Sequence, residues 1–172
     1  MILETNRLFL REMREEDFDA LYAILADSDV TQHYPYTFDD SRVRNWITRN
    51  ITRYRTDGFG LWAVIRKDTG EMIGDCGLTM QNIRGQTLPE IGYHIRKDHW
   101  KMGYGSEAAA ACINWTFAYT DFPAVYSYMK YTNTASRRTA MKCGMEFVEE
   151  YPDPDNTVTA VYTISREKWI NR

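Results

Sequence analysis

The stretch HWKMGYGSEAAAAC, His99–Cys112, joins a run that is typical of a strand to a run that is typical of a helix. The preceding segment LPEIGYHIRK is predicted to be a strand, and the alanines that follow Glu107 favour a helix. Gly103 and Gly105 stand one residue apart in the connection. The expected fold and function depend on what this glycine loop does.

The loop formally matches a dinucleotide-binding fingerprint. Gly103, Gly105 and Ala108 fit G-x-G-x-x-A, but seven residues separate Ile95 from Gly103, whereas that fingerprint follows its strand almost at once. A P-loop is excluded because the chain contains no G-x-x-x-x-G-K-[ST]. An ordinary flexible connection is the second interpretation, since glycine is common wherever a backbone must turn.

The third interpretation is a cradle for pyrophosphate at the start of a helix. Backbone N–H groups from Met102 to Ser106 are expected to be unpaired there, and the helix dipole adds partial positive charge. The missing side chains of Gly103 and Gly105 would let a diphosphate approach these groups closely, and Lys101 would add a full charge. A strand before the loop and a helix after it are the context that this interpretation needs.

Outside the loop, hydrophobic periodicity predicts that helices and strands alternate in one domain, residues 1–172. Strands are expected at 7–13, 60–67, 71–80, 88–97, 124–131, 145–151 and 157–169. Helices are expected at 15–27, 39–58, 106–120 and 134–144. A DTG turn at 68–70 joins two strands as a hairpin, and 81–87 is expected to be a second turn or a loop.

Composition narrows the function classes. A net charge of −3 provides no basic field for nucleic acid, and 44% hydrophobic residues suit a globular domain. Cys76, Cys112 and Cys143 form no C-x-x-C pair, so we expect neither a disulfide framework nor a metal site. Free thiols and the lack of a signal-peptide pattern predict a cytoplasmic location, and without a run of about 18 apolar residues no membrane association is expected.

Residues 90–115, EIGYHIRKDHWKMGYGSEAAAACINW, resemble motif A of the GCN5-related N-acetyltransferase (GNAT) family. The branch that acetylates ribosomal-protein N-termini is the most similar, since it carries a GYGTEA-like loop. Residues 4–24 are similar to the opening of that branch, and residues 132–147 to its N-x-x-S…K-x-G-F segment. The resemblance covers nearly the whole chain.

The resemblance implies an α+β fold with a mostly antiparallel, splayed mixed sheet of about seven strands and about four flanking helices. It also implies transfer of an acetyl group from acetyl-CoA to a primary amine by direct attack in a ternary complex. The pantetheine arm would pair with Tyr93, His94 and Ile95, and Asn133 would contact the same arm. The pyrophosphate would lie on Lys101, Met102, Gly103, Tyr104, Gly105 and Ser106.

Three residues are candidates for proton transfer. Glu90, on the strand beside the expected thioester cleft, is the first choice as base, although it could be a surface glutamate. Ser136, the serine of N-x-x-S, is either an acid toward the thiolate or a helix cap. Tyr128 is a third candidate, with a core role as its alternative. Ala140 stands where many family members carry a tyrosine acid, which leaves the proton donor open.

The loop after the first helix is expected to border the acceptor site. His33, Tyr34 and Tyr36 are its candidate lining residues, unless the loop simply packs on its own aromatic rings. The acceptor is an amine, on a protein N-terminus or a small molecule, and a homodimer is compatible with the family. Arginines along the second helix form either a solvated face or a surface for an acidic partner: Arg42, Arg44, Arg49, Arg53 and Arg55.

A different class of function is also compatible with the sequence. A fold does not guarantee its chemistry, and Ala140 is compatible with a catalytically weak or inactive GNAT-fold module that only binds acyl-CoA or another ligand.

Overall fold

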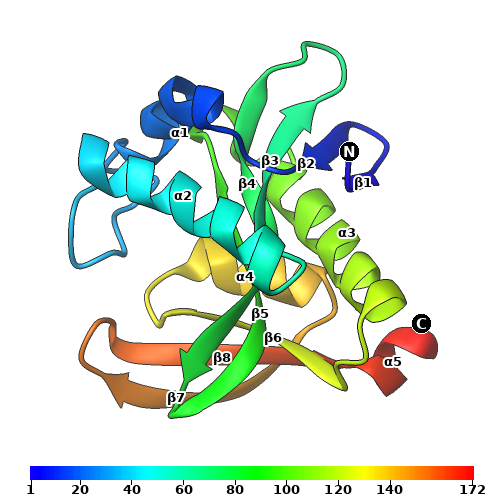
Figure 1. Cartoon of the computed structure of the whole chain (residues 1–172). Coiled ribbons are helices and arrows are strands. Elements are labelled where there is room, and N and C mark those ends of the chain that lie inside the picture. Colours follow the sequence, from blue (N-terminus) through cyan, green and yellow to red (C-terminus); the bar gives the residue numbers. More distant parts are fainter.

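The computed structural model describes residues 1–172 and contains one eight-stranded sheet, shown in Figure 1. Its strands are β1 (Leu3–Glu4), β2 (Leu8–Arg11), β3 (Leu61–Arg66), β4 (Met72–Ile83), β5 (Gln86–Ile95), β6 (Ala124–Lys130), β7 (Glu146–Asp153) and β8 (Thr157–Ser165). Their spatial order is β1-β2-β3-β4-β5-β6-β8-β7. All neighbouring strands are antiparallel except β5 and β6, so the expected mixed and mostly antiparallel α+β sheet is confirmed.

Five α-helices and two 3₁₀ turns accompany the sheet. They are η1 (Glu15–Asp17), α1 (Phe18–Leu25), α2 (Asp40–Thr56), η2 (Lys97–His99), α3 (Tyr104–Tyr119), α4 (Thr134–Lys142) and α5 (Arg166–Ile170). None of the helices is long and apolar enough to cross a membrane. The side chain of Asp39 caps α2 by accepting from the backbone N–H of Arg42 at 2.8 Å.

Both faces of the sheet are covered, which explains why β3 is a continuous apolar run, LWAVI, up to its last residue, Arg66. Trp62 and Val64 point into a core cluster with α3, while Ala63 and Ile65 point into a second cluster with α1 and α2. Figure 1 shows α1 and α2 on one side of the strands and α3 on the other. A side chain on a central strand therefore belongs either to the α2 face or to the α3 face.

Strands β5 and β6 form the only parallel pair, and they meet at a single point, Glu90 opposite Tyr126. Beyond that pair no ladder joins them, so the sheet is open between the C-terminal ends of the two strands. This opening corresponds to the expected splay and makes Glu90 the last paired residue before it.

The last predicted strand, 157–169, is wrong in its final residues. β8 ends at Ser165, whose hydroxyl caps the short helix α5 by accepting from the backbone N–H of Lys168 at 3.1 Å. The prediction extended the strand to Trp169 although Arg166, Glu167 and Lys168 are charged, and it missed Ser165 as a helix cap. Strand β1 was not expected because two residues are too short to show periodicity.

The turn or loop expected at 81–87 is a tight turn, and most of these residues belong to a long β4–β5 hairpin. Pairing runs to Ile83 and Gln86, so only Arg84 and Gly85 form the turn, with φ values of 51° and 78°. Two successive positive φ angles define the turn type that best joins antiparallel strands, and its first position favours Asn, Asp or Gly. Because Arg84 occupies that position, the sequence did not predict the hairpin.

Candidate active site

The glycine loop forms a cradle of free backbone amides. None of the N–H groups from Lys101 to Ser106 donates a hydrogen bond to another part of the protein. Lys101 and Gly103 adopt left-handed φ values of 63° and 83°, which turn the chain into the start of α3. A Cβ atom at Gly105 would lie 3.6 Å from Ile95, so a larger side chain would occupy the space beside the end of β5.

Hydrogen bonds from neighbouring segments hold the glycine loop in place. Glu107, in the first turn of α3, accepts from the guanidinium Nε of Arg7 at 2.7 Å and from the hydroxyl of Thr5 at 2.6 Å. Arg7 also donates to the carbonyl of Met102 at 2.9 Å. On the other side, the indole N–H of Trp100 donates to the carbonyl of Ile95 at 2.7 Å. These bonds fix the loop relative to β2 and β5, and they leave its own N–H groups free for an anion.

Glu90 is buried on the α2 face, with only 8% of its surface exposed. The hydroxyl of Thr79, on the paired strand β4, donates to its carboxylate at 3.1 Å. Burial raises the pKa of Glu90 to about 7, although the Thr79 bond and the charge of His94 act in the opposite direction. The carboxylate folds over Gly92, where an added Cβ would lie 3.0 Å from it. Glu90 is therefore a carboxyl group that takes up and releases a proton near neutral pH.

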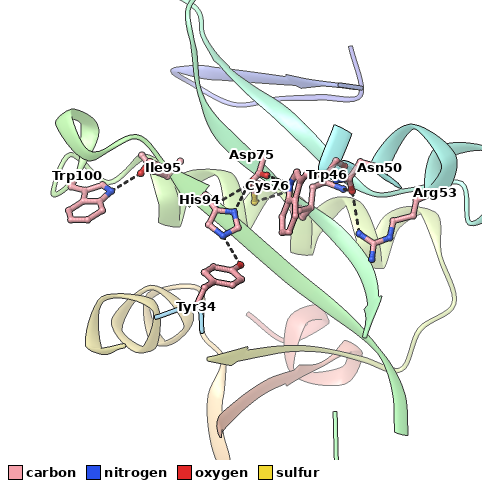
Figure 2. A network of polar contacts seen from close by, with 11 residues as sticks. Tyr34, Trp46, Asn50, Arg53, Asp75, Cys76, His94, Ile95 and Trp100 are labelled. Carbon is pink, nitrogen blue, oxygen red and sulfur yellow. Dashed lines mark hydrogen bonds and ion pairs between the residues drawn. The ribbon is translucent and has the colours of Figure 1, made fainter. Parts of the chain in front are cut away.

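His94 lies on the same face as Glu90, because the β4–β5 register is unbroken from Gly74–Ile95 to Ile83–Gln86. Figure 2 shows it between Asp75 and Tyr34. Its Nδ1 is 2.8 Å from a carboxylate oxygen of Asp75, and its Nε2 is 2.8 Å from the hydroxyl of Tyr34. The indole of Trp46, on α2, donates to the other oxygen of Asp75 at 2.9 Å. We call Trp46, Asp75, His94 and Tyr34 the histidine network.

Electrostatics hold this network together. Asp75 is fully buried on β4. Burial lowers the pKa of His94, but the neighbouring Asp75 carboxylate outweighs burial and raises that pKa overall. Burial also raises the pKa of Tyr34 well above its ordinary value, so its hydroxyl stays protonated. The network fixes the α2 helix and the 26–39 loop against the strands that carry Glu90.

The second strand of the opening contributes Tyr128. Along β6, Val125, Ser127 and Met129 are buried toward α3, so Tyr126 and Tyr128 project toward the α2 face. Burial raises the pKa of Tyr128, and the charge of Glu90 adds to the effect. Its hydroxyl has no hydrogen-bond partner within the protein. The structure thus brings Tyr128 into the surroundings of Glu90.

Ser136 lies on the other side of the opening, in the first turn of α4. Asn133 is the cap of this helix, because its side chain accepts from the N–H of Ser136 at 3.1 Å. The capping role considered for Ser136 therefore belongs to Asn133, and the Ser136 hydroxyl has no protein partner. Tyr93, which faces α4 from β5, donates to the carbonyl of Ser136 at 3.2 Å. Ala140 is buried beside Tyr93 and Ile91.

The three residues expected to line the acceptor site, His33, Tyr34 and Tyr36, occupy different environments. Tyr34 is part of the histidine network and not a free lining residue. Tyr36 is 39% exposed, and the guanidinium of Arg42 stacks 4.0 Å above its ring. His33 is partly buried, and burial together with the charge of Lys130 lowers its pKa. Of the three, Tyr36 and His33 remain available to line an acceptor site.

Sequence reasoning did not identify Trp46 and Thr79 as residues of this site, nor Asp75 as a buried partner, and it named Arg53 only as one of the arginines of the second helix. One signal was present, because Asp75 interrupts the run MIGDCGL in the part of β4 that is continuously buried, residues 72–79. A buried carboxylate needs a partner, which pointed to a side chain on a neighbouring strand. The three cysteines are buried and free, and no group of three or more His, Cys, Asp or Glu side chains is arranged to hold a metal ion.

Comparison with known proteins shows which family the chain resembles. The family model of the acetyltransferase (GNAT) domain matches residues 7–146. The uncharacterized protein YkkB of Bacillus subtilis is 37% identical over 146 residues, which span 84% of this chain and 85% of YkkB. The uncharacterized N-acetyltransferase YoaA of the same organism is 29% identical over 150 residues, 84% of this chain and 82% of YoaA.

A similar fold is also found in a solved structure. RimL, the ribosomal L7/L12 α-N-protein acetyltransferase, in complex with coenzyme A, has a TM-score of 0.80 over 97% of this chain and 98% of RimL, at 17% identity. At that identity the likeness concerns the fold. Since the GNAT family model covers most of the chain, from β2 to the start of β7, this protein belongs to the GNAT family of N-acetyltransferases.

Proposed function

We propose that this protein transfers the acetyl group of acetyl-CoA to a primary amine, on a protein N-terminus or a small molecule, with Glu90 as the general base. One observation carries the proposal: a buried carboxyl group with a pKa of about 7 lies at the last pair before the sheet opens. An amine is mostly protonated at neutral pH and cannot attack a carbonyl carbon in that form, so a base with a pKa near the working pH is needed.

The cradle and the end of β5 are suited to hold the co-substrate. The free N–H groups of residues 101–106 would bind the diphosphate, the backbone of residues 93–95 would pair with the pantetheine arm, and the Asn133 amide would contact the same arm. Bound acetyl-CoA supplies the thioester carbonyl that the amine attacks. The absence of a side chain at Gly105 keeps the approach to β5 open.

Glu90 accepts the proton of the incoming ammonium, directly or through water. Its position on the α2 face means that the amine approaches from the side of α2 and the 26–39 loop. The attack is direct, in a ternary complex, so holding both reactants at the opening supplies much of the rate. The histidine network holds α2 and the 26–39 loop in place on this side of Glu90. In this proposal it makes no contact with the reacting atoms.

In this proposal Ser136 stabilises the leaving thiolate by donating a hydrogen bond, and the thiolate then takes its proton from water. The Ser136 hydroxyl has no protein partner, and its carbonyl accepts from Tyr93 on the co-substrate side, where Ala140 offers no donor. Tyr128 is the alternative donor, but its side chain projects toward the α2 face, as Glu90 does, and so belongs to the acceptor side. If the Ser136→Ala variant keeps its full rate, Ser136 does not have this role, and Tyr128 becomes the assigned donor.

The first test is the variant Glu90→Gln. We expect the acetylation rate to fall more than tenfold, because general base catalysis contributes about 10²–10⁴-fold, while acetyl-CoA binding persists. Release of free CoA against a panel of amines measures the rate, and calorimetry measures binding. Glu71→Gln, a substitution of an exposed glutamate, is the matched control and should keep its rate.

The same assay decides on the alternative function. A module that binds acetyl-CoA but releases no CoA with any amine would be a ligand-binding member of the fold, as Ala140 suggests. Turnover that does not change between Glu90→Gln and the unmodified protein at any pH would remove Glu90 from the mechanism.

A further inference from the structure

Three arginines on α2 share one face and have no acidic partner. Arg42, Arg49 and Arg53 are spaced by seven and four residues, so they lie along one stripe of the helix. None of them forms an ion pair, whereas Arg44, on the opposite face, pairs with Asp40 at 2.7 Å. We call Arg42, Arg49 and Arg53 the arginine stripe.

The inner end of the arginine stripe, Arg53, lies near enough to Glu90 for their charges to interact. Arg53 is partly buried, and its guanidinium donates only a long bond of 3.4 Å to the side chain of Asn50, which Figure 2 shows. Burial and the charge of Arg49 lower the pKa of Arg53 overall, although the charges of Asp57 and Glu90 act in the opposite direction. The guanidinium of Arg53 therefore lies on the acceptor side of the opening, and most of its N–H groups have no hydrogen-bond acceptor within the protein.

The outer end borders a cavity of about 340 Å³ lined by Arg42, Arg49, Tyr36 and Trp46, among others. Trp46 also belongs to the histidine network, so this cavity adjoins that network, which lies on the same face of the sheet as Glu90. Asp39 is the one acidic residue of the lining, and its carboxylate is engaged in capping α2. Two arginines face this one carboxylate, so a net positive charge remains within the cavity.

The length of the stripe distinguishes between anionic ligands. Eleven residues of helix separate Arg42 from Arg53, about 16 Å at 1.5 Å per residue. A single carboxylate next to an amine at Glu90 would reach only Arg53. An extended peptide covers about 16 Å with five residues at 3.3 Å each, and so reaches all three arginines.

We propose that the acceptor is an acidic peptide N-terminus, whose amine lies at Glu90 and whose following carboxylate side chains bind the arginine stripe. This inference rests on the proposed function, since it names the substrate class of the same site. Guanidinium groups suit this role because they bind carboxylates with two parallel hydrogen bonds.

Binding in the presence of CoA, which prevents turnover, tests this proposal by calorimetry. The probes are the amidated peptides Ala-Glu-Glu-Ala-Glu, Ala-Gln-Gln-Ala-Gln and Ala-Lys-Lys-Ala-Lys, and free alanine. We expect the glutamate peptide to bind at least about tenfold tighter than the glutamine peptide, the factor given by one charge-assisted hydrogen bond. The double variant Arg49→Gln/Arg53→Gln should lose this advantage. Arg55→Gln, the same change on the opposite face of α2, should keep it.

Each other outcome contradicts the proposal. Equal or tighter binding of the glutamine or lysine peptide, no binding of the glutamate peptide, or an advantage that survives the double variant would each overturn it. Free alanine binding as tightly as the glutamate peptide would indicate a small carboxylate-bearing amine instead of a peptide. An unchanged affinity of both variants for CoA verifies their folding. Because the readout needs no turnover, a peptide that binds but is never acetylated counts against the proposed function alone.

Discussion

The two sides of the opening between β5 and β6 are built by different means. On the co-substrate side, consecutive backbone N–H groups of residues 101–106 do the binding, and glycines provide the space. On the acceptor side, single side chains from α2, β4, β5 and β6 converge around Glu90. A backbone cradle suits a ligand that is the same in every turnover, whereas a wall of side chains can be changed residue by residue to fit another acceptor.

The largest effect is expected on the backbone side. Gly105→Glu places a long carboxylate beside Ile95 and next to the diphosphate, so acetyl-CoA affinity should fall at least about 100-fold, the cost of about 3 kcal/mol expected from a blocked and repelled anion. Calorimetry measures the affinity. Ala118→Glu adds the same charge at the exposed far end of α3 and should bind normally. Normal binding by Gly105→Glu would show that the cradle is not the diphosphate site.

The next effect concerns stability on the acceptor side. Asp75→Asn removes the buried charge that holds His94 and Trp46, and should lower the free energy of unfolding by about 3 kcal/mol. Asp98→Asn is the matched control, since Asp98 pairs with His99 at 2.7 Å but is exposed, and should cost under about 1 kcal/mol. Urea unfolding measures both. Equal losses would mean that burial does not distinguish the two Asp–His pairs.

The pH dependence of the Asp75–His94 pair has a definite sign. The pKa of His94 is raised in the folded protein, so its protonation stabilises the fold fully below the ordinary value of 6.5, and this stabilisation is lost as the pH rises through the folded pKa. The difference in unfolding free energy between the unmodified protein and Asp75→Asn should therefore shrink between pH 6 and pH 9. A difference that grows with pH would contradict the assigned charge state.

The smallest effect is expected from Thr79→Val, which keeps the shape of the side chain and removes the hydroxyl that bonds Glu90. Because this bond lowers the pKa of Glu90, its loss should move the midpoint of the pH–rate profile upward by about one pH unit, or about 1.4 kcal/mol. The rate on the alkaline plateau should change little. A downward movement would mean that Thr79 does not bond the carboxylate.

Local patterns made the co-substrate side predictable. The glycine loop, the alanine-rich helix and the strand before them follow one another in the chain, so residues 88–120 predicted both the fold and the cradle. The errors lie where a local signal is unusual or was missed: Arg84 stands in a turn that favours Asn, and Ser165 caps a helix directly after a strand. Neither error affects the opening.

The acceptor side depended on contacts that the chain order does not reveal. Glu90 was identified by its place on the strand, but its pKa depends on burial and on Thr79, which the β4–β5 register places opposite it. The pairing of Asp75 with His94 follows from the same register, and only the packing of α2 brings Trp46 to Asp75. The arginines of α2 could be seen in the sequence, but not which of them lack partners.

The titration of Glu90 itself tests the central claim most directly. Nuclear magnetic resonance of the ¹³C-labelled carboxyl group, assigned by its absence in Glu90→Gln, follows the protonation of this one residue in the folded protein. We predict a midpoint near pH 7, where burial places its pKa. A midpoint near the ordinary glutamate value of 4.5 would contradict the account, because the carboxyl group would then be a weak base of the kind found on any protein surface.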